Sequence, residues 1–91
     1  MTNVMWTCYV VTCADGTLYT GITTAVIRRI AEHNRGVGAK YTRGRGPVTL
    51  AYREAHRSRA AAARREHEIK RLSRAEKLAL ISGRRRPRSR A

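Results

Sequence analysis

Acidic residues are scarce in this chain of 91 residues. Asp and Glu together number 6, against 20 Lys and Arg, so the formal net charge is +14. So few carboxylates argue against a metal site built from several acidic ligands. The excess of positive charge predicts a polyanionic partner, most simply nucleic acid. Most of the basic residues are arginine, whose planar donor fork suits phosphate oxygens.

Cysteines, long apolar runs and targeting signals are rare or absent. Cys8 and Cys13 are the two cysteines, and their spacing matches no metal-binding pair. We expect both to be small packing residues in a reducing cytoplasm. No apolar run approaches the roughly 20 residues that span a bilayer, which argues against a membrane role. The first residues lack a basic segment and a small-residue cleavage site, so no signal peptide is predicted.

Residues 6–22 predict an antiparallel hairpin. The chain on both sides of Asp15-Gly16 is rich in β-branched and aromatic residues, and Asp-Gly is turn chemistry. A two-residue turn would point Tyr9 and Tyr19 to opposite faces. A three-residue loop with a left-handed Gly16 puts both phenols on one face and gathers apolar residues on the other. The alternation therefore favours the three-residue loop.

The rest of the chain predicts one more strand and three helices. The strand covers residues 48–55, and the helices cover 25–34, 59–72 and 73–81. The predicted N-caps are Thr24, Ser58 and Ser73, and the predicted helix stops are Gly36 and Gly83. On the first helix the predicted apolar stripe consists of Val26, Ile27, Ile30 and Ala31.

These elements indicate an α/β (α+β) domain with a small three-stranded antiparallel sheet flanked by about three helices. The length fits one domain, which we place at residues 1–82, followed by a basic, disordered tail over 83–91. No obligate protein partner is inferred.

Three polar side chains lie where the helical periodicity makes them candidates for chemistry. Arg29 and His33 share a helix face close to the margin of the buried stripe. Glu66 falls within about 60° of Ile69, toward the interior, where a carboxylate needs a cation or metal beside it. An ion pair with Lys70 is the alternative to a metal.

A second acid on the same helix, Glu68, lies about 100° from Ile69. Arg64 and Arg71 are its expected surface partners.

The order and spacing of these residues resemble the GIY-YIG nuclease superfamily. Tyr9 stands in "CYV", and Tyr19 begins "YTG". Arg29 follows the second tyrosine by ten residues, His33 comes one helical turn later, and Glu66 lies on a later helix. The stretches "TGIT", "EHN", "GAKYTRGR" and "EIKRL" make the chain most similar to the small, single-domain bacterial members.

The resemblance implies a catalytic set of Tyr9, Tyr19, Arg29 and His33. Tyr19 would position or deprotonate the attacking water, with Tyr9 in support, and His33 is the rival general base. Arg29 would stabilise charge on the phosphoryl oxygens. Glu66 would bind a divalent cation, Mg²⁺ or Mn²⁺, in a hydrated site. Without the resemblance, cross-strand packing would be the simpler role for the tyrosines.

A glycine-rich basic segment, residues 36–47, is the candidate element for holding nucleic acid. Its glycines would let the backbone approach phosphates. Lys40, Arg43 and Arg45 supply charge, and Tyr41 offers a ring for an unstacked base. A flexible, solvated loop is the alternative.

The sequence thus predicts a phosphodiester hydrolase, a metal-dependent endonuclease acting on DNA, with single-stranded or branched DNA preferred. DNA is favoured over RNA as the partner. The alternative is a non-catalytic DNA- or RNA-binding module that keeps the nuclease fold. Leu78 stands where many members carry an asparagine, which agrees with that alternative.

Overall fold

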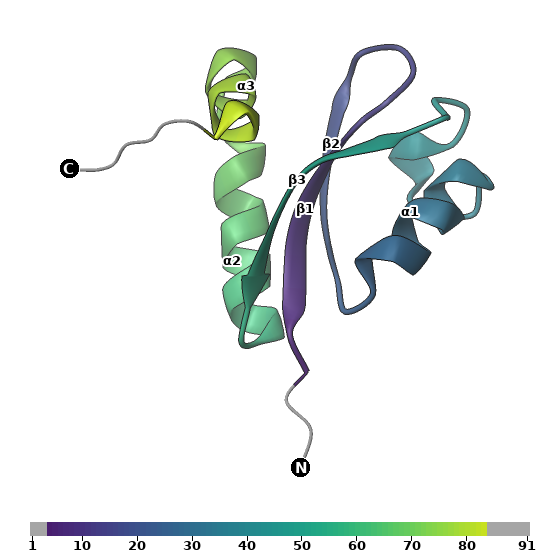
Figure 1. The fold of residues 1–91 in the computed structure, drawn as a ribbon. Helices are drawn as coiled ribbons and strands as arrows, with labels where there is room; N and C mark the ends of the chain where they lie inside the picture. Colours follow the sequence, from purple (N-terminus) through teal and green to yellow (C-terminus); the bar gives the residue numbers. More distant parts are fainter. Residues whose placement is uncertain (1–3, 84–91) are drawn as a thin grey trace.

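An antiparallel sheet with the strand order β2-β1-β3 forms the centre of the molecule (Figure 1). A computed structural model describes residues 4–83. The elements are β1 Trp6–Thr12, β2 Leu18–Thr23, α1 Val26–Asn34, η1 Lys40–Thr42, β3 Thr49–His56, α2 Arg59–Lys70 and α3 Arg74–Ser82. The predicted α+β class and the three-stranded sheet are confirmed. The predicted tail lies outside the described residues, apart from Gly83.

The register of the hairpin confirms the three-residue loop. Tyr9 is paired with Gly21 and Val11 with Tyr19, so both phenols lie on one face. The Cys13 N–H donates to the Thr17 carbonyl at 2.8 Å and closes the loop. Gly16 has a φ of +86°, the left-handed conformation that this loop requires.

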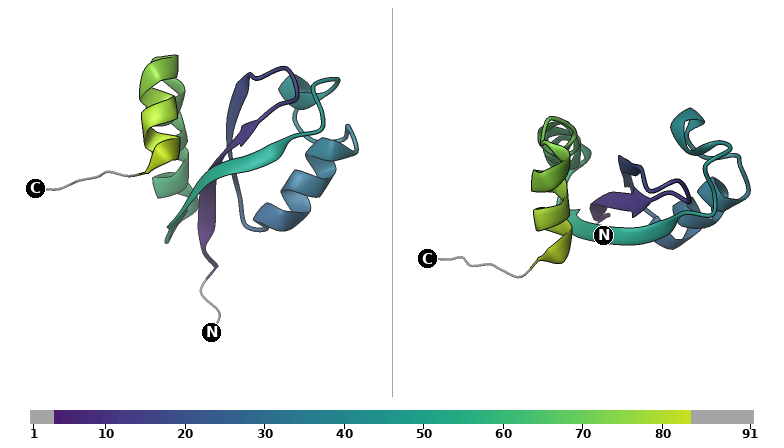
Figure 2. Two further views of the ribbon diagram at one scale, coloured as in Figure 1. Left: turned by 45° about the horizontal axis from the view of Figure 1, so that its top comes forward. Right: turned by 90° about the horizontal axis from the view of Figure 1, so that it is seen from above.

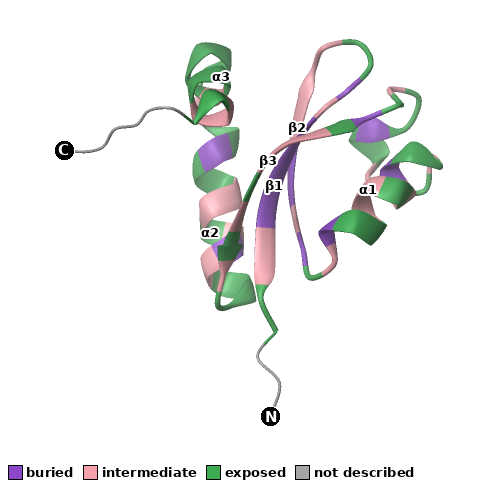
Figure 3. Ribbon diagram, in the orientation of Figure 1, coloured by how far each residue is buried: buried purple, intermediate pink, exposed green. Residues whose placement is uncertain are grey.

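Each face of the sheet has its own core. α1 packs on the face that carries the phenols, and α2 and α3 pack on the opposite face (Figures 1 and 2). Cys8 and Val10 pack against Ile69 of α2. On the phenol face, Val11 and Cys13 pack together with Val48, Tyr19 and Ile30. Figure 3 shows this burial concentrated in β1, the central strand. Both cysteines are buried and unpaired, as expected for packing residues.

Most helix boundaries agree with their sequence signals. The Ser58 hydroxyl accepts a hydrogen bond from the Ala61 N–H, and Ser73 and Glu76 form a capping box. Gly36 and Gly83 follow their helices with positive φ. The predicted Thr24 cap is wrong, because α1 begins after Ala25 and has no side-chain cap.

The predicted buried face of α1 is also partly wrong. Ile27 is 74% exposed, whereas His33 is only 1% exposed. Val26, Ile30 and His33 recur at the spacing of one helix face, and that face meets the sheet. A hydrogen-bonded histidine has therefore taken a core position that an apolar pattern does not predict.

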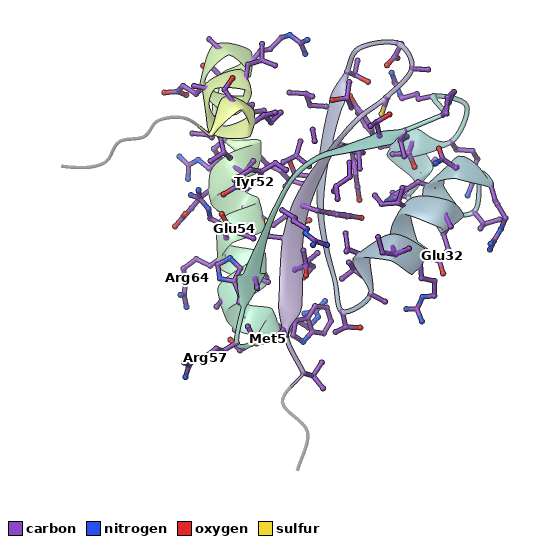
Figure 4. The ribbon with its side chains drawn as sticks, in the orientation of Figure 1. Met5, Glu32, Tyr52, Glu54, Arg57 and Arg64 are labelled. Carbon is purple, nitrogen blue, oxygen red and sulfur yellow. The ribbon has the colours of Figure 1, made fainter. Side chains whose placement is uncertain are left out.

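A polar cluster joins β3 to α2 on the face away from the phenols. The Glu54 carboxylate accepts hydrogen bonds from the Tyr52 hydroxyl at 2.5 Å and from Arg65 Nε at 3.0 Å, and its Oε2 lies 2.6 Å from His56 Nε2. Tyr52 and Glu54 project from β3 toward α2 (Figure 4). Burial alone would raise the pKa of Glu54, but these hydrogen bonds and the Arg65 charge lower it overall.

Candidate active site

Tyr9 is buried at the centre of the phenol face, with 1% of its surface exposed. Its ring lies over Gly21, its cross-strand partner. A Cβ at position 21 would come within 2.7 Å of the Tyr9 hydroxyl oxygen, so only glycine leaves room for this ring. The pairing of tyrosine and glycine across the hairpin thus explains why "YTG" ends in glycine.

A buried hydrogen-bonded chain runs from Tyr9 through His33 to the segment after α1. The Tyr9 hydroxyl lies 2.9 Å from His33 Nε2, and His33 Nδ1 lies 2.7 Å from Thr42 Oγ1. The Thr42 hydroxyl donates to the Ala39 carbonyl at 3.0 Å. Tyr9, His33 and Thr42 are each 1% exposed. The sequence did not predict Thr42 as part of the site, because its contact with His33 is non-local.

We infer the tautomer of His33 from the partners of its two ring nitrogens. A hydroxyl has one proton, and that of Thr42 goes to Ala39, so its oxygen acts as an acceptor toward Nδ1. Nδ1 then carries the imidazole proton, and Nε2 accepts from Tyr9. The Ala39 N–H also points at Nδ1, but at 3.4 Å this contact is longer than an ordinary hydrogen bond.

Burial keeps Tyr9 and His33, which are hydrogen-bonded to each other, uncharged near neutral pH. It raises the pKa of Tyr9 to about 12, with smaller contributions in the same direction from Tyr19 and Glu66 and an opposing one from Arg29. Burial and the nearby Arg29 charge lower the pKa of His33. Tyr9 therefore remains a phenol and His33 a neutral imidazole.

Tyr19 is the accessible phenol of the cluster. It is half-buried, and its ring meets His33 edge-on at 5.4 Å and stacks on Tyr41 at 5.6 Å. Its hydroxyl makes no hydrogen bond with the residues that the structure describes. Of the two phenols, Tyr19 is thus the one that an incoming molecule can contact.

Arg29 lies beside Tyr9 and His33 and already makes an ion pair with Glu32. Its Nη1 donates to Glu32 Oε1 at 2.9 Å, and the guanidinium is close enough to Tyr9 to offset part of the increase in its pKa. Glu32 lies on the outer side of α1 (Figure 4). The half-buried guanidinium keeps other donors for an anion at the phenol face.

Glu66 lies on α2, close enough to the phenol face for its charge to act on Tyr9. Its side chain is 23% exposed, and Oε2 pairs with Lys70 Nζ at 3.1 Å, the alternative predicted from the sequence. The Lys70 ammonium in turn lies 5.9 Å from the centre of the Tyr19 ring. Glu68 is an exposed surface charge, as predicted, but its partner is Arg65 at 3.1 Å rather than Arg64 or Arg71.

The donor set restricts how a metal could be held. Within residues 4–83 no three His, Cys, Asp or Glu side chains gather as a metal cage. Glu66 offers Oε1, which makes no hydrogen bond or ion pair with the described residues. One such carboxylate fits a hydrated divalent cation that takes its other ligands from water and a phosphate.

The glycine-rich segment is more ordered than a solvated loop. It contains η1, and the side-chain oxygen of Asn34 accepts from the Val48 N–H at 2.6 Å and so fixes the end of the segment. Arg45 is committed to structure, with Nη1 donating to Asp15 at 2.6 Å and Nε to the Tyr41 carbonyl at 2.8 Å. Its guanidinium also lies 4.5 Å from the centre of the Tyr41 ring.

The two remaining basic residues of this segment, Lys40 and Arg43, are exposed. Neither pairs with a carboxylate of the described part of the chain.

Comparison with known proteins finds a matching family model and similar chains. Residues 5–79 match the model of the GIY-YIG catalytic domain. A UPF0213 protein of Halobacterium salinarum is 64% identical over 73 residues, which cover 80% of this chain and 95% of that protein. A UPF0213 protein of Staphylococcus haemolyticus is 55% identical over 76 residues, which cover 84% of this chain and 93% of that protein.

Among solved structures, the solution structure of the UPF0213 protein of Bacillus halodurans is similar to this fold. The two structures superpose with a TM-score of 0.57, and the sequences are 49% identical. The match covers 88% of this chain and 85% of the Bacillus halodurans chain. No helix within residues 4–83 has both the length and the apolar character that a membrane crossing requires.

Proposed function

This chain belongs to the GIY-YIG catalytic domain family, a nuclease family, and on that premise we propose that it is a metal-dependent endonuclease that hydrolyses phosphodiester bonds of DNA. We expect single-stranded or branched DNA to be preferred over duplex DNA and RNA.

One observation carries the proposal: an accessible phenol lies next to a polar cluster of the kind that phosphodiester hydrolysis needs. The Tyr19 ring contacts His33, which is bonded to Tyr9. Arg29 and Glu66 both lie within electrostatic reach of Tyr9. A half-buried guanidinium and a half-buried carboxylate near Tyr9, with the half-buried Tyr19 phenol on the same face, would supply charge relief and proton handling in one place.

Burial supports Tyr19, rather than His33, as the group that contacts the attacking water. Both nitrogens of His33 are bonded and the residue is 1% exposed, so water has little access to either nitrogen. We assign Tyr9 and His33 a positioning role, in which their hydrogen bond holds the phenol face rigid beneath Tyr19. Arg29 would stabilise charge on the phosphoryl oxygens.

Glu66 would hold the Mg²⁺ or Mn²⁺ through the oxygen that Lys70 leaves open. When bound, the ion supplies a positive charge that polarises the phosphate.

A non-catalytic nucleic-acid-binding module is the second candidate. The pairing of Glu66 with Lys70 favours it, because a cation already neutralises the carboxylate. The two candidates differ in one measurable property, which is cleavage.

The test is a cleavage assay with labelled single-stranded, branched and duplex DNA and RNA in Mg²⁺, Mn²⁺ or chelator. We expect metal-dependent cleavage that Glu66→Gln abolishes, with DNA binding retained. Glu68→Gln is the matched control on the same helix and should cleave normally, because its carboxylate is exposed. Binding without cleavage in every metal would favour the second candidate, and normal cleavage by Glu66→Gln would remove that residue from the mechanism.

A further inference from the structure

A basic cavity lies next to Tyr19 and involves residues outside the predicted catalytic set. It has a volume of about 210 Å³ and is lined by Thr17, Leu18, Tyr41, Arg74 and Lys77. These residues come from three separate parts of the chain: the start of β2 with the residue before it, η1 and α3. The fold therefore creates a concave site that no local stretch of sequence indicates.

The cavity adjoins the phenol face at Tyr41. Tyr41 lines the cavity and stacks on the Tyr19 ring at 5.6 Å. A polymer strand with one unit at the Tyr19 hydroxyl would therefore have an adjoining unit within reach of Tyr41.

The charges in the cavity are uncompensated. Arg74 and Lys77 are three residues apart on α3, so their side chains are neighbours. Neither makes an ion pair with a carboxylate of residues 4–83. Glu76, the acid between them, is occupied in the capping box with Ser73. Two adjacent like charges destabilise a helix slightly unless an anion lies between them.

We propose that this cavity binds the nucleotide next to the scissile phosphate of a single DNA strand. Arg74 and Lys77 would bind its phosphate, and Tyr41, a residue that is 42% exposed, would contact its base or sugar. The assignment rests on the proposed nuclease function, because that function places the scissile phosphate at Tyr19. It adds α3 to the substrate-binding surface and directs the strand across the edge of β2.

The first test measures binding of a short oligothymidylate in chelator, so that the result does not depend on cleavage. The double variant Arg74→Gln/Lys77→Gln should bind about tenfold more weakly, and its log–log salt slope should fall by about 0.7, the contribution of the one phosphate that loses its cations. The control is Arg57→Gln/Arg64→Gln, which removes the same charge from the N-terminal part of α2 and the turn before it, away from α3 (Figure 4). Equal decreases in affinity in both double variants would show that only overall charge matters and would overturn the site.

The second test maps the oligothymidylate by backbone NMR shifts of the wild-type protein. Shifts at Thr17, Leu18, Arg74 and Lys77 are expected together with those at Tyr19. Unshifted α3 signals at saturation would overturn the proposal, even if the protein cleaves DNA. A protein that binds through this cavity and never cleaves would instead contradict the nuclease function and would leave the cavity as a nucleotide-binding site with no scissile phosphate beside it.

Discussion

At the scale of single residues, the two phenols on one face of the sheet differ in exposure and so in expected role. Tyr19→Phe removes an accessible hydroxyl that has no partner in the described structure, so folding should survive. Cleavage should fall by at least about tenfold, the lower range of acid–base effects. Kinetics together with urea unfolding would show both outcomes.

Tyr9→Phe is the companion variant and should behave differently. It leaves the buried Nε2 of His33 without a donor, which should cost about 1–3 kcal/mol of unfolding free energy. Normal cleavage by both variants would mean that the tyrosines serve packing alone.

Thr42 is the residue that we expect to fix the tautomer of His33. Thr42→Val keeps the shape of the side chain but removes the acceptor at Nδ1, so the imidazole should lose its preference for the Nδ1–H form. Thr42→Ser keeps the hydroxyl and should restore that preference. Long-range ¹H–¹⁵N spectra of the imidazole report the tautomer directly, without reference to activity. An unchanged tautomer in Thr42→Val would contradict this role.

At the scale of elements, the Glu54 cluster is the polar connection between β3 and α2. Because the pKa of Glu54 is lowered in the folded state, its contribution to stability is complete above the ordinary carboxyl pKa. That contribution is lost as the pH falls through the folded value. Glu54→Gln should therefore lower the unfolding free energy by about 1–3 kcal/mol at pH 7, and the difference from wild type should shrink in acid.

Urea unfolding across the acid range measures this effect, with Glu68→Gln as the exposed control. A deficit of Glu54→Gln that stays constant down to low pH would show that the carboxylate charge is not what stabilises the cluster.

The elements also show what sequence could and could not predict. Alternation determined the register of the hairpin, because a shift of one residue would have moved Tyr9 to the wrong face. The caps at Ser58 and Ser73 are local interactions and could be predicted. The burial of His33 could not be predicted, because this polar residue becomes part of the core only when Tyr9 of β1 and Thr42 of η1 hydrogen-bond to it. For the same reason neither Thr42 nor the Asp15–Arg45 pair could be predicted.

At the scale of the whole molecule, the net charge of +14 should determine affinity more than chemistry. Deleting residues 84–91 removes five arginines. If these arginines bind phosphates, the truncated protein should bind single strands more weakly. The log–log salt slope of binding should fall by about 0.7 for each phosphate that no longer has an arginine beside it. Cleavage at saturating DNA should be unchanged. A truncated protein with the full slope would show that these arginines do not touch the strand.

The separate cores on the two faces of the sheet each contain one cysteine, Cys8 on the α2 side and Cys13 on the α1 side. Burial raises the pKa of Cys8 to about 11, so in the folded state its thiol is both covered and protonated. Each layer thus has its own chemical reporter. The order in which the two thiols react with an alkylating reagent under native conditions would tell which layer opens first, the one that carries the phenols or the one that supports them.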